Sequence, residues 1–317
     1  MYRAITIWDT SIATRNVGDE IIMDAVNLQT AKIAPTSQIF RVPTHNYLTI
    51  GSYKCLRESE FSIVGGSNLL SSNMPFYQQW NLLPFELLFS KDIVLLGVGW
   101  WQYQKNPNWY TRLLLQKALS AKFLHSARDS YTVARLKSIG IKNAINTGCP
   151  TTWALTPEHC ASISEEKSSN VIYTLTDYAR NADADLKTLK ILRQNYSKVK
   201  IWLQGSRDYE YLQSLGADGF YDELIPPQLN AYDIALSEKD CEYVGTRLHA
   251  GIRALQQMKR SLVIAVDNRA IEKSKDMGLH VVKRSELEHL QELISCKRAT
   301  DLRIPFDKID EWKNQFS

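Results

Sequence analysis

The stretch CEYVGTRLHAGIRAL (residues 241–255) predicts a buried strand that leads directly into a helix. CEYVG has the short apolar character of a strand in a parallel sheet, and the residues after it are mostly apolar with a helical pattern. Arg247 and His249 therefore fall at the amino end of the helix, where backbone N–H groups and the helix dipole favour an anion. A guanidinium and an imidazole at this position predict either an anion site with proton transfer beside it or a surface anchor.

The same alternation of short apolar runs and longer amphipathic segments extends over most of the chain. It predicts strands over 3–8, 61–66, 92–99, 122–127, 170–175, 199–205, 241–245 and 261–266, and a helix over about 18–32. The polar segment 156–170 interrupts the pattern and marks a domain boundary. We therefore expect an α/β protein of two Rossmann-like domains facing a cleft, residues 1–160 and 161–317. The closing helix within 304–316 could pack back onto the first domain.

Composition narrows the class of protein. The 38 Lys and Arg residues against 34 Asp and Glu leave a net charge of +4, which is too small and too scattered for a dedicated nucleic-acid binder. The five cysteines form no CxxC pair, and the six histidines are dispersed, so we expect reduced thiols, no metal and no cofactor. No stretch of the sequence has the length and apolar character of a membrane-spanning helix. We expect a cytoplasmic protein whose basic surplus suits peripheral contact with the inner face of a membrane.

Ligands in open parallel sheets bind beyond the carboxyl ends of the strands, which singles out the segment RNVGDEIIMDA. Asn16 can cap the helix that follows, and Gly18 permits close approach of a ligand to the backbone. Asp19 is suited to binding a hydroxyl or to acting as a base. Asp19 and Glu20 equally suit the positive end of a helix without any ligand, so a structural role is the alternative.

Two further strand ends carry candidate residues. Gly66 permits a tight turn after the strand predicted over 61–66, and Ser67 and Asn68 present polar groups there, although a turn of this kind is also common without any ligand. Arg128 follows another strand, where it is either a second anion contact or an ion-pair partner.

Taken in this order, these motifs resemble the polysaccharide pyruvyl transferase family. The matching pieces are NVGDEII, VGGSNLL, GVG at 97–99, ARDSYTVARLKSIGI at 127–141, GTRLHAGIRAL at 245–255 and DNRAIEKSKDMGL at 267–279. The resemblance spans about residues 5–280 and implies a fold like that of the B-type glycosyltransferases (GT-B). It also implies phosphoenolpyruvate as donor and a sugar as acceptor. Whether this sugar is free, polymeric or lipid-linked stays open. The product would be a cyclic pyruvate ketal across two sugar hydroxyls.

For this reaction we assign His249 as general acid and base, and Arg247 as the contact to the donor's phosphate or carboxylate. Arg128 would be the second anion contact, and Asp19 and Asn16 would orient or deprotonate acceptor hydroxyls. The remaining candidates for substrate binding are Gly18, Gly66, Ser67 and Asn68. Two rival functions stay open: a GT-B nucleotide-sugar glycosyltransferase, in which Arg247 would hold a diphosphate, and a non-catalytic polysaccharide-binding relative.

Overall fold

The computed structural model describes residues 3–77 and 79–316, and its contacts divide the chain into two units. Unit 1 consists of Met1–Thr14, Ile22–Trp153 and Ile304–Ser317, and unit 2 consists of Arg15–Ile21 and Ala154–Arg303. The division therefore falls before residue 160, where the sequence places it. In addition, a short segment near the amino terminus belongs to unit 2, and the carboxyl-terminal segment belongs to unit 1.

Unit 1 is built on a four-stranded parallel sheet with the order β2-β1-β3-β4. Its strands are β1 (Ala4–Asp9), β2 (Gln38–Pro43), β3 (Ser62–Gly65) and β4 (Ile93–Leu96), followed by the parallel pair β5 (His125–Ala127) and β6 (Ala144–Asn146). Its helices are α1 (Gly18–Ile33, beginning in the segment of unit 2), α2 (Ile50–Glu58), η1 (Pro84–Leu88), α3 (Trp109–Ala118), α4 (Ser130–Ser138), η2 (Pro150–Thr152) and α12 (Phe306–Asn314). A single parallel bridge between Val98 and Ala127 continues the sheet towards β5.

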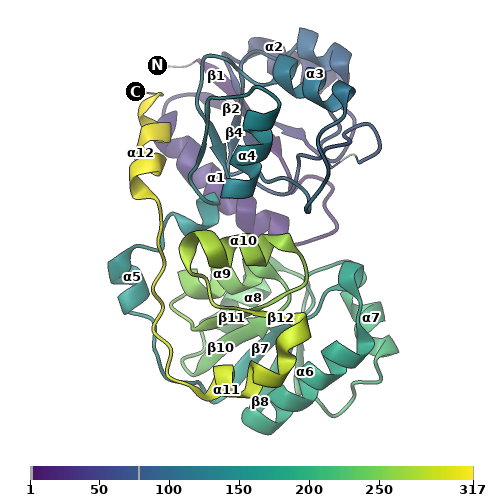
Figure 1. Ribbon diagram of the computed structural model, residues 1–317, viewed down its shortest axis with the longest axis vertical. Helices are drawn as coiled ribbons and strands as arrows, with labels where there is room; N and C mark the ends of the chain where they lie inside the picture. Colours follow the sequence, from purple (N-terminus) through teal and green to yellow (C-terminus); the bar gives the residue numbers. More distant parts are fainter. Residues whose placement is uncertain (1–2, 78, 317) are drawn as a thin grey trace. The chain divides into compact units, whose positions relative to one another are not determined.

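Helices cover both faces of the sheet in unit 1 (Figure 1). Successive side chains of β3 point to opposite faces, so Val64 and Ile63 lie in different cores. The core around Val64 also contains residues of α2, α3 and α4, whereas the core around Ile63 contains residues of α1 and α12. Because both faces are covered, β3 and β4 are buried at every position, which explains their continuous apolar sequences.

Unit 2 contains a six-stranded parallel sheet with the order β12-β11-β10-β7-β8-β9. Its strands are β7 (Asn170–Thr174), β8 (Lys198–Trp202), β9 (Glu223–Ile225), β10 (Cys241–Gly245), β11 (Ser261–Ala265) and β12 (Val281–Lys283). Its helices are α5 (Pro157–Ala161), η3 (Asp177–Ala179), α6 (Ala182–Asn195), α7 (Asp208–Ser214), α8 (Leu229–Leu236), α9 (Leu248–Gln256), α10 (Asn268–Met277), η4 (Arg284–His289) and α11 (Leu290–Ser295). In the described part of the chain, no helix is long and apolar enough to cross a membrane.

The strand order reverses once in each sheet. In unit 2 the chain runs from β7 outwards to β8 and β9, then returns to the other side of β7 as β10 and continues to β11 and β12. In unit 1 it runs from β1 to β2 and then returns to the other side of β1 as β3. Open parallel sheets bind their ligands at such switch points, beyond the carboxyl ends of the two strands. The loops after β7 and β10 and those after β1 and β3 are therefore the first places to look for a site.

Candidate active site

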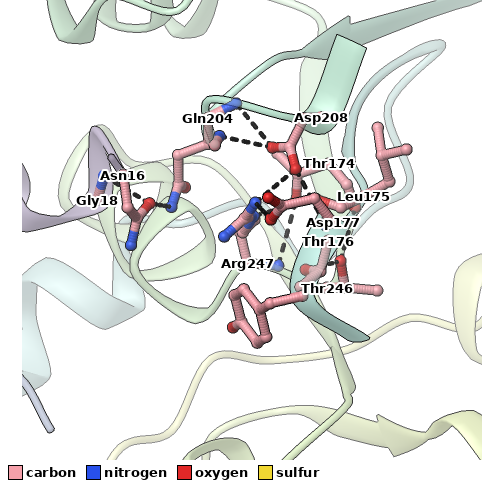
Figure 2. Close-up of polar contacts among 12 residues, drawn as sticks. Asn16, Gly18, Thr174, Leu175, Thr176, Asp177, Gln204, Asp208, Thr246 and Arg247 are labelled. Atoms are coloured by element: carbon pink, nitrogen blue, oxygen red, sulfur yellow. Dashed lines mark hydrogen bonds and ion pairs between the residues drawn. The ribbon is translucent and has the colours of Figure 1, made fainter. Parts of the chain in front are cut away.

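Arg247 lies between β10 and α9, at the switch point of unit 2, and only 3% of its surface is exposed. Figure 2 shows its guanidinium held by groups that follow β7 and β8. Nε donates to the carbonyl of Leu175 at 3.0 Å, and Nη2 donates to Oδ1 of Asp177 at 2.9 Å and of Asp208 at 2.5 Å. Nη1 donates to none of the described residues. Arg247 is thus a fixed cation with one guanidinium nitrogen that none of the described residues engages.

Hydroxyl groups fix the backbone of Arg247 as well. Its N–H donates to Oγ1 of Thr174 at 3.2 Å, and its carbonyl accepts from the hydroxyl of Tyr243 at 2.7 Å. The hydroxyl oxygens of Thr174 and Tyr243 are 2.6 Å apart, as are those of Thr176 and Thr246. These bonds join the ends of β7 and β10, so the direction of the arginine side chain is set before any ligand arrives.

The segment before α1 packs beside this cluster (Figure 2). Oδ1 of Asn16 accepts from Nε2 of Gln204 at 2.6 Å and from the N–H of Gly18 at 3.1 Å. The backbone of Asn16 also forms an antiparallel bridge with Gly205. Gly205 has to be glycine, because a Cβ there would lie 2.3 Å from Nη2 of Arg247. Asn16 and Gly18, both candidates from the sequence, are therefore brought close to the arginine.

His249 and Asp19 occupy equivalent positions in two helices. His249 is the second residue of α9 and Asp19 the second residue of α1, and both side chains are buried. The N-cap residue of α9 is Arg247, whose side chain makes no capping hydrogen bond. A helix end that carries a guanidinium and an imidazole can bind an anion and transfer a proton to or from it.

The two carboxylates beside Arg247 control the charge of the cluster. With both ionised, the trio carries one net negative charge and would repel an anion. Burial raises the pKa of Asp208, and the guanidinium of Arg247 offsets this effect only in part. Asp208 is therefore a buried carboxyl group that is held by the guanidinium and in turn fixes the position of Arg247.

Residues after β7 and β11 extend the cluster. The ring centroid of Tyr178 lies 5.1 Å from Cζ of Arg247 and 5.7 Å from Cζ of Arg269. Arg269 in turn pairs with Asp267 at 2.6 Å. Asn268 is only 6% exposed, and within the described ranges neither its side-chain oxygen nor its nitrogen has a hydrogen-bond partner. A buried amide without partners is costly, and a bound water or a ligand would satisfy it.

The sequence prediction misses several residues of this cluster, namely Asp177, Tyr178, Asp208, Asn268 and Arg269. The rule that selected Arg247, namely that ligands bind beyond the carboxyl ends of parallel strands, could also have selected these residues. Each of them follows a predicted strand by a few positions. Applying that rule to the end of every strand would have found the segments TDYAR, QGSRD and DNR.

The other candidate residues lie in unit 1, near its own switch point. Gly66 (φ +60°) and Ser67 (φ +61°) form a left-handed turn after β3, and the carbonyl of Ser67 accepts from the N–H of Gly99 at 2.8 Å. The guanidinium of Arg128 is buried against Gly99, where a Cβ would lie 2.3 Å from Cζ. Nε of Arg128 donates to Oδ2 of Asp129 at 3.2 Å, so Arg128 makes the ion pair that was one of its two expected roles.

The structure therefore divides the predicted residues into two groups. Unit 2 brings together Asn16, Gly18, Asp19, Arg247 and His249, and unit 1 brings together Gly66, Ser67, Asn68 and Arg128. In the second group, Oδ1 of Asn68 is buried and accepts no hydrogen bond from the part of the chain that the structure describes. Over residues 3–77 and 79–316, no three His, Cys, Asp or Glu side chains are close enough to hold a metal ion.

The fold is of the GT-B type, which confirms the predicted fold class. The UDP-GlcNAc 2-epimerase of Methanocaldococcus jannaschii, solved with UDP-GlcNAc and UDP, matches with a TM-score of 0.56 and 12% sequence identity over 96% of this chain and 96% of that one. MnaA of S. aureus, solved with UDP, matches with a TM-score of 0.56 and 12% identity over 99% of this chain and 97% of that one. At this identity, the likeness establishes the fold alone.

A comparison of the sequence with protein-family models identifies the family of the chain. The family model for polysaccharide pyruvyl transferases matches residues 16–268, which is most of the chain. The protein therefore belongs to the polysaccharide pyruvyl transferase family, as its motifs predicted. The match runs from Asn16 to Asn268 and so includes every candidate residue from the sequence. A search of curated proteins finds no match.

Proposed function

We propose that this protein transfers the pyruvyl group of phosphoenolpyruvate to two hydroxyls of a sugar in a polysaccharide or its precursor. The product is a cyclic ketal, and phosphate is released. The observation that carries the proposal is the pair Arg247 and His249 at the amino end of α9, in a chain of the polysaccharide pyruvyl transferase family. Phosphoenolpyruvate carries a carboxylate and a phosphate, and a fixed guanidinium at the amino end of a helix suits either of them.

The chemistry requires proton transfer in both directions. His249 gives a proton to the methylene carbon of the donor, which makes C2 electrophilic. One sugar hydroxyl attacks C2 and returns its proton to His249. The second hydroxyl then forms the other C–O bond as the bond from C2 to the phosphate oxygen breaks, and its proton leaves with the phosphate. An imidazole suits this cycle because its pKa lies near neutral pH.

Arg247 would contact the donor through Nη1, because its other two guanidinium nitrogens are engaged by Leu175, Asp177 and Asp208. This contact uses one nitrogen, whereas an unengaged guanidinium can make a bidentate contact with a phosphate or carboxylate. Asp177 and Asp208 then act as positioning residues that hold the guanidinium in place. Asp19 and Asn16 would orient or deprotonate the acceptor hydroxyls, and Arg128 would supply the second anion contact.

The first test is a thermal-shift titration with phosphoenolpyruvate. A ligand that binds only the folded protein stabilises it by about 2.7 kcal/mol at 100 times its Kd. The informative variant is Arg247→Lys, because Arg247→Ala would leave Asp177 and the buried Asp208 without their cation. We expect the wild type to shift and the Lys variant to lose most of that shift, since lysine cannot reproduce the geometry of the guanidinium.

UDP-GlcNAc serves as the competing ligand in the same titration. A shift with UDP-GlcNAc and none with phosphoenolpyruvate would replace pyruvyl transfer by nucleotide-sugar chemistry. If phosphoenolpyruvate binds, phosphate release is measured with a panel of pyranosides, and the product is checked by mass spectrometry for the ketal. Sugar binding without phosphate release for any acceptor would favour a non-catalytic relative.

A further inference from the structure

Unit 1 exposes large apolar side chains on the helices that cover one face of its sheet. Trp109, Leu88 and Phe76 are 76%, 83% and 84% exposed. The buried sides of α2, η1 and α3 all pack into the core around Val64, so their opposite sides face solvent together. We call the exposed side chains of α2, η1 and α3, with those of loops 73–76 and 101–108, the outer face of unit 1. Exposed apolar groups gathered in one region usually mark a binding surface.

The elements of the outer face are joined to one another. The ring of Tyr53 in α2 lies 6.2 Å from that of Phe85 in η1. The N–H of Met74 donates to Oγ1 of Thr111 at 2.9 Å, which ties the loop 73–76 to α3, and α3 also lies against η1. The exposed groups therefore belong to one continuous surface.

Helix α3 has basic and apolar residues on the same exposed side. Trp109, Arg112, Leu113 and Lys117 recur at the spacing of a single helix face, and all four side chains are exposed. An ordinary surface helix would present mainly polar and charged groups there. A helix face that alternates lysine or arginine with tryptophan and leucine is typical of segments that lie at a membrane interface.

Helix α2 repeats the arrangement. Ile50, Lys54 and Arg57 lie four and three residues apart, so they share one side of the helix, and all three are exposed. Ile50 is 76% exposed. Two separate helices of the same layer thus combine apolar and basic groups on their solvent side.

The outer face is also strongly basic. The segments of the outer face contain five Lys and Arg residues and two acidic ones, whereas the whole chain has 38 against 34; the five are Lys54, Arg57, Lys105, Arg112 and Lys117. Of the two acidic residues, Glu86 is buried, where it accepts from the N–H of Leu83. Glu58 lines a separate pocket with Arg3 at the amino end of β1. Among the described residues of the outer face, five cations therefore stand against one exposed carboxylate, that of Glu58.

We infer that the outer face of unit 1 binds the surface of an anionic lipid bilayer. Trp109, Leu88 and Phe76 would enter the headgroup region, and the lysines and arginines would lie over lipid phosphates with their aliphatic stems against the apolar groups. A second copy of the chain is a poorer occupant, because a two-fold symmetric contact would bring two basic surfaces together. An acidic polysaccharide matches the charge but offers little apolar surface to the protruding side chains.

Vesicle co-sedimentation of the full chain tests the inference. The probes are vesicles of phosphatidylcholine with and without phosphatidylglycerol. We expect binding to the anionic vesicles only, weakened by salt because exposed charges are screened. Arg112→Gln with Lys117→Gln should weaken binding by about five-fold for each cation removed. Trp109→Ala should weaken it by about ten-fold through the lost apolar contact.

Matched controls lie elsewhere on the chain. Lys32→Gln with Lys239→Gln removes two exposed cations outside the outer face, and Ile234→Ala removes an apolar side chain that is 63% exposed on α8. These variants should bind like the wild type. Equal losses in test and control variants, equal binding to neutral vesicles, or no binding at all would overturn the inference. So would a dimer that light scattering detects in the wild type and that Trp109→Ala abolishes. No donor or acceptor sugar is present, so the outcome is independent of the proposed pyruvyl transfer.

Discussion

Each unit buries an arginine at the carboxyl end of a strand, but the two are held in different ways. Arg247 in unit 2 is fixed by Leu175, Asp177 and Asp208, which come from the ends of two other strands. Arg128 in unit 1 pairs with its sequence neighbour Asp129 and lies against the backbone of glycine 99.

The contrast extends to the loops around each arginine. In unit 2, side-chain hydroxyls and carboxylates join the strand ends, as between Thr174 and Tyr243. In unit 1, the strand ends are shaped by backbone turns of positive φ at Gly66, Ser67 and Gly97. Substitutions around Arg247 should therefore act through charges and hydrogen bonds, whereas those at the turns after β3 and β4 should act through backbone conformation.

The largest effect is expected for His249→Ala. If the imidazole at the start of α9 transfers protons, its loss should lower kcat for phosphate release by about 10²–10⁴-fold. The apparent Kd for phosphoenolpyruvate, measured by thermal shift, should change little, because Arg247 and the helix end remain. A folded variant whose turnover stays within a few-fold of wild type would remove His249 from the mechanism.

Asp208→Ala should have a large effect on stability. The substitution removes one of the two carboxylates that pair with the buried Arg247. It also removes the oxygen that accepts from the N–H groups of Gln204 and Gly205. We expect a loss of about 3–5 kcal/mol in the free energy of unfolding, measured with urea.

The matched variant in unit 1 is Asp129→Ala, which removes the partner of Arg128 and the cap that accepts from the N–H of Thr132 at 2.7 Å. Its expected cost is similar, about 3–5 kcal/mol, because it takes the carboxylate of Asp129 from the buried guanidinium of Arg128 and the cap from α4. A clearly smaller loss than in Asp208→Ala would mean that the ion pair between sequence neighbours contributes less to stability than the long-range contacts of Arg247.

Local sequence patterns are sufficient to predict most of the sheet framework. All eight predicted strands overlap observed ones, because strands buried on both faces have continuous apolar sequences. The strand β2 (QIFRVP) was missed, since it lies at the edge of its sheet and exposes much of its length. The strands β9 and β12 are three-residue edge strands, and the sequence prediction misses them for the same reason.

Long-range contacts explain what the sequence could not predict. Arg247 and its partners Asp177 and Asp208 are separated by 70 and 39 residues, and only the strand order brings them together. The pairing of Asn16 with Gln204 spans 188 residues. Candidate residues can be found one strand end at a time. Which nitrogens of the Arg247 guanidinium are engaged by its partners, and which one is not, follows only from the assembled sheet.

His125 provides a pH test in unit 1. It is buried at the start of β5, where Nε2 lies 2.9 Å from the carbonyl oxygen of Ser120, and burial lowers its pKa to about 4 from the usual 6.5. Because the unfolded chain takes up the proton first, this group's contribution to stability is complete above pH 6.5 and is lost as the pH falls to about 4. The full loss is about 3 kcal/mol.

The measurement is the free energy of unfolding of the wild type and of His125→Gln at neutral and acidic pH. The variant costs stability at neutral pH because it loses its hydrogen bonds, and the difference between the two proteins should shrink as the pH falls towards 4. A difference that stays constant over this range would mean that the imidazole is not kept neutral by burial.

The smallest effect on stability is expected for two glycines that have nearly the same backbone conformation. Gly66 has φ +60° and Gly216 has φ +58°, but a Cβ on Gly66 would lie 2.2 Å from Cγ2 of Ile22, whereas a Cβ on Gly216 would have no atom within 4 Å among the described residues. Gly216→Ala should cost about 1 kcal/mol through the left-handed conformation alone. Gly66→Ala should cost about 2 kcal/mol, because the clash with Ile22 adds to it. Urea unfolding of both variants gives the comparison, and equal losses would mean that the turn after β3 relaxes freely and does not hold unit 1's strand end in shape.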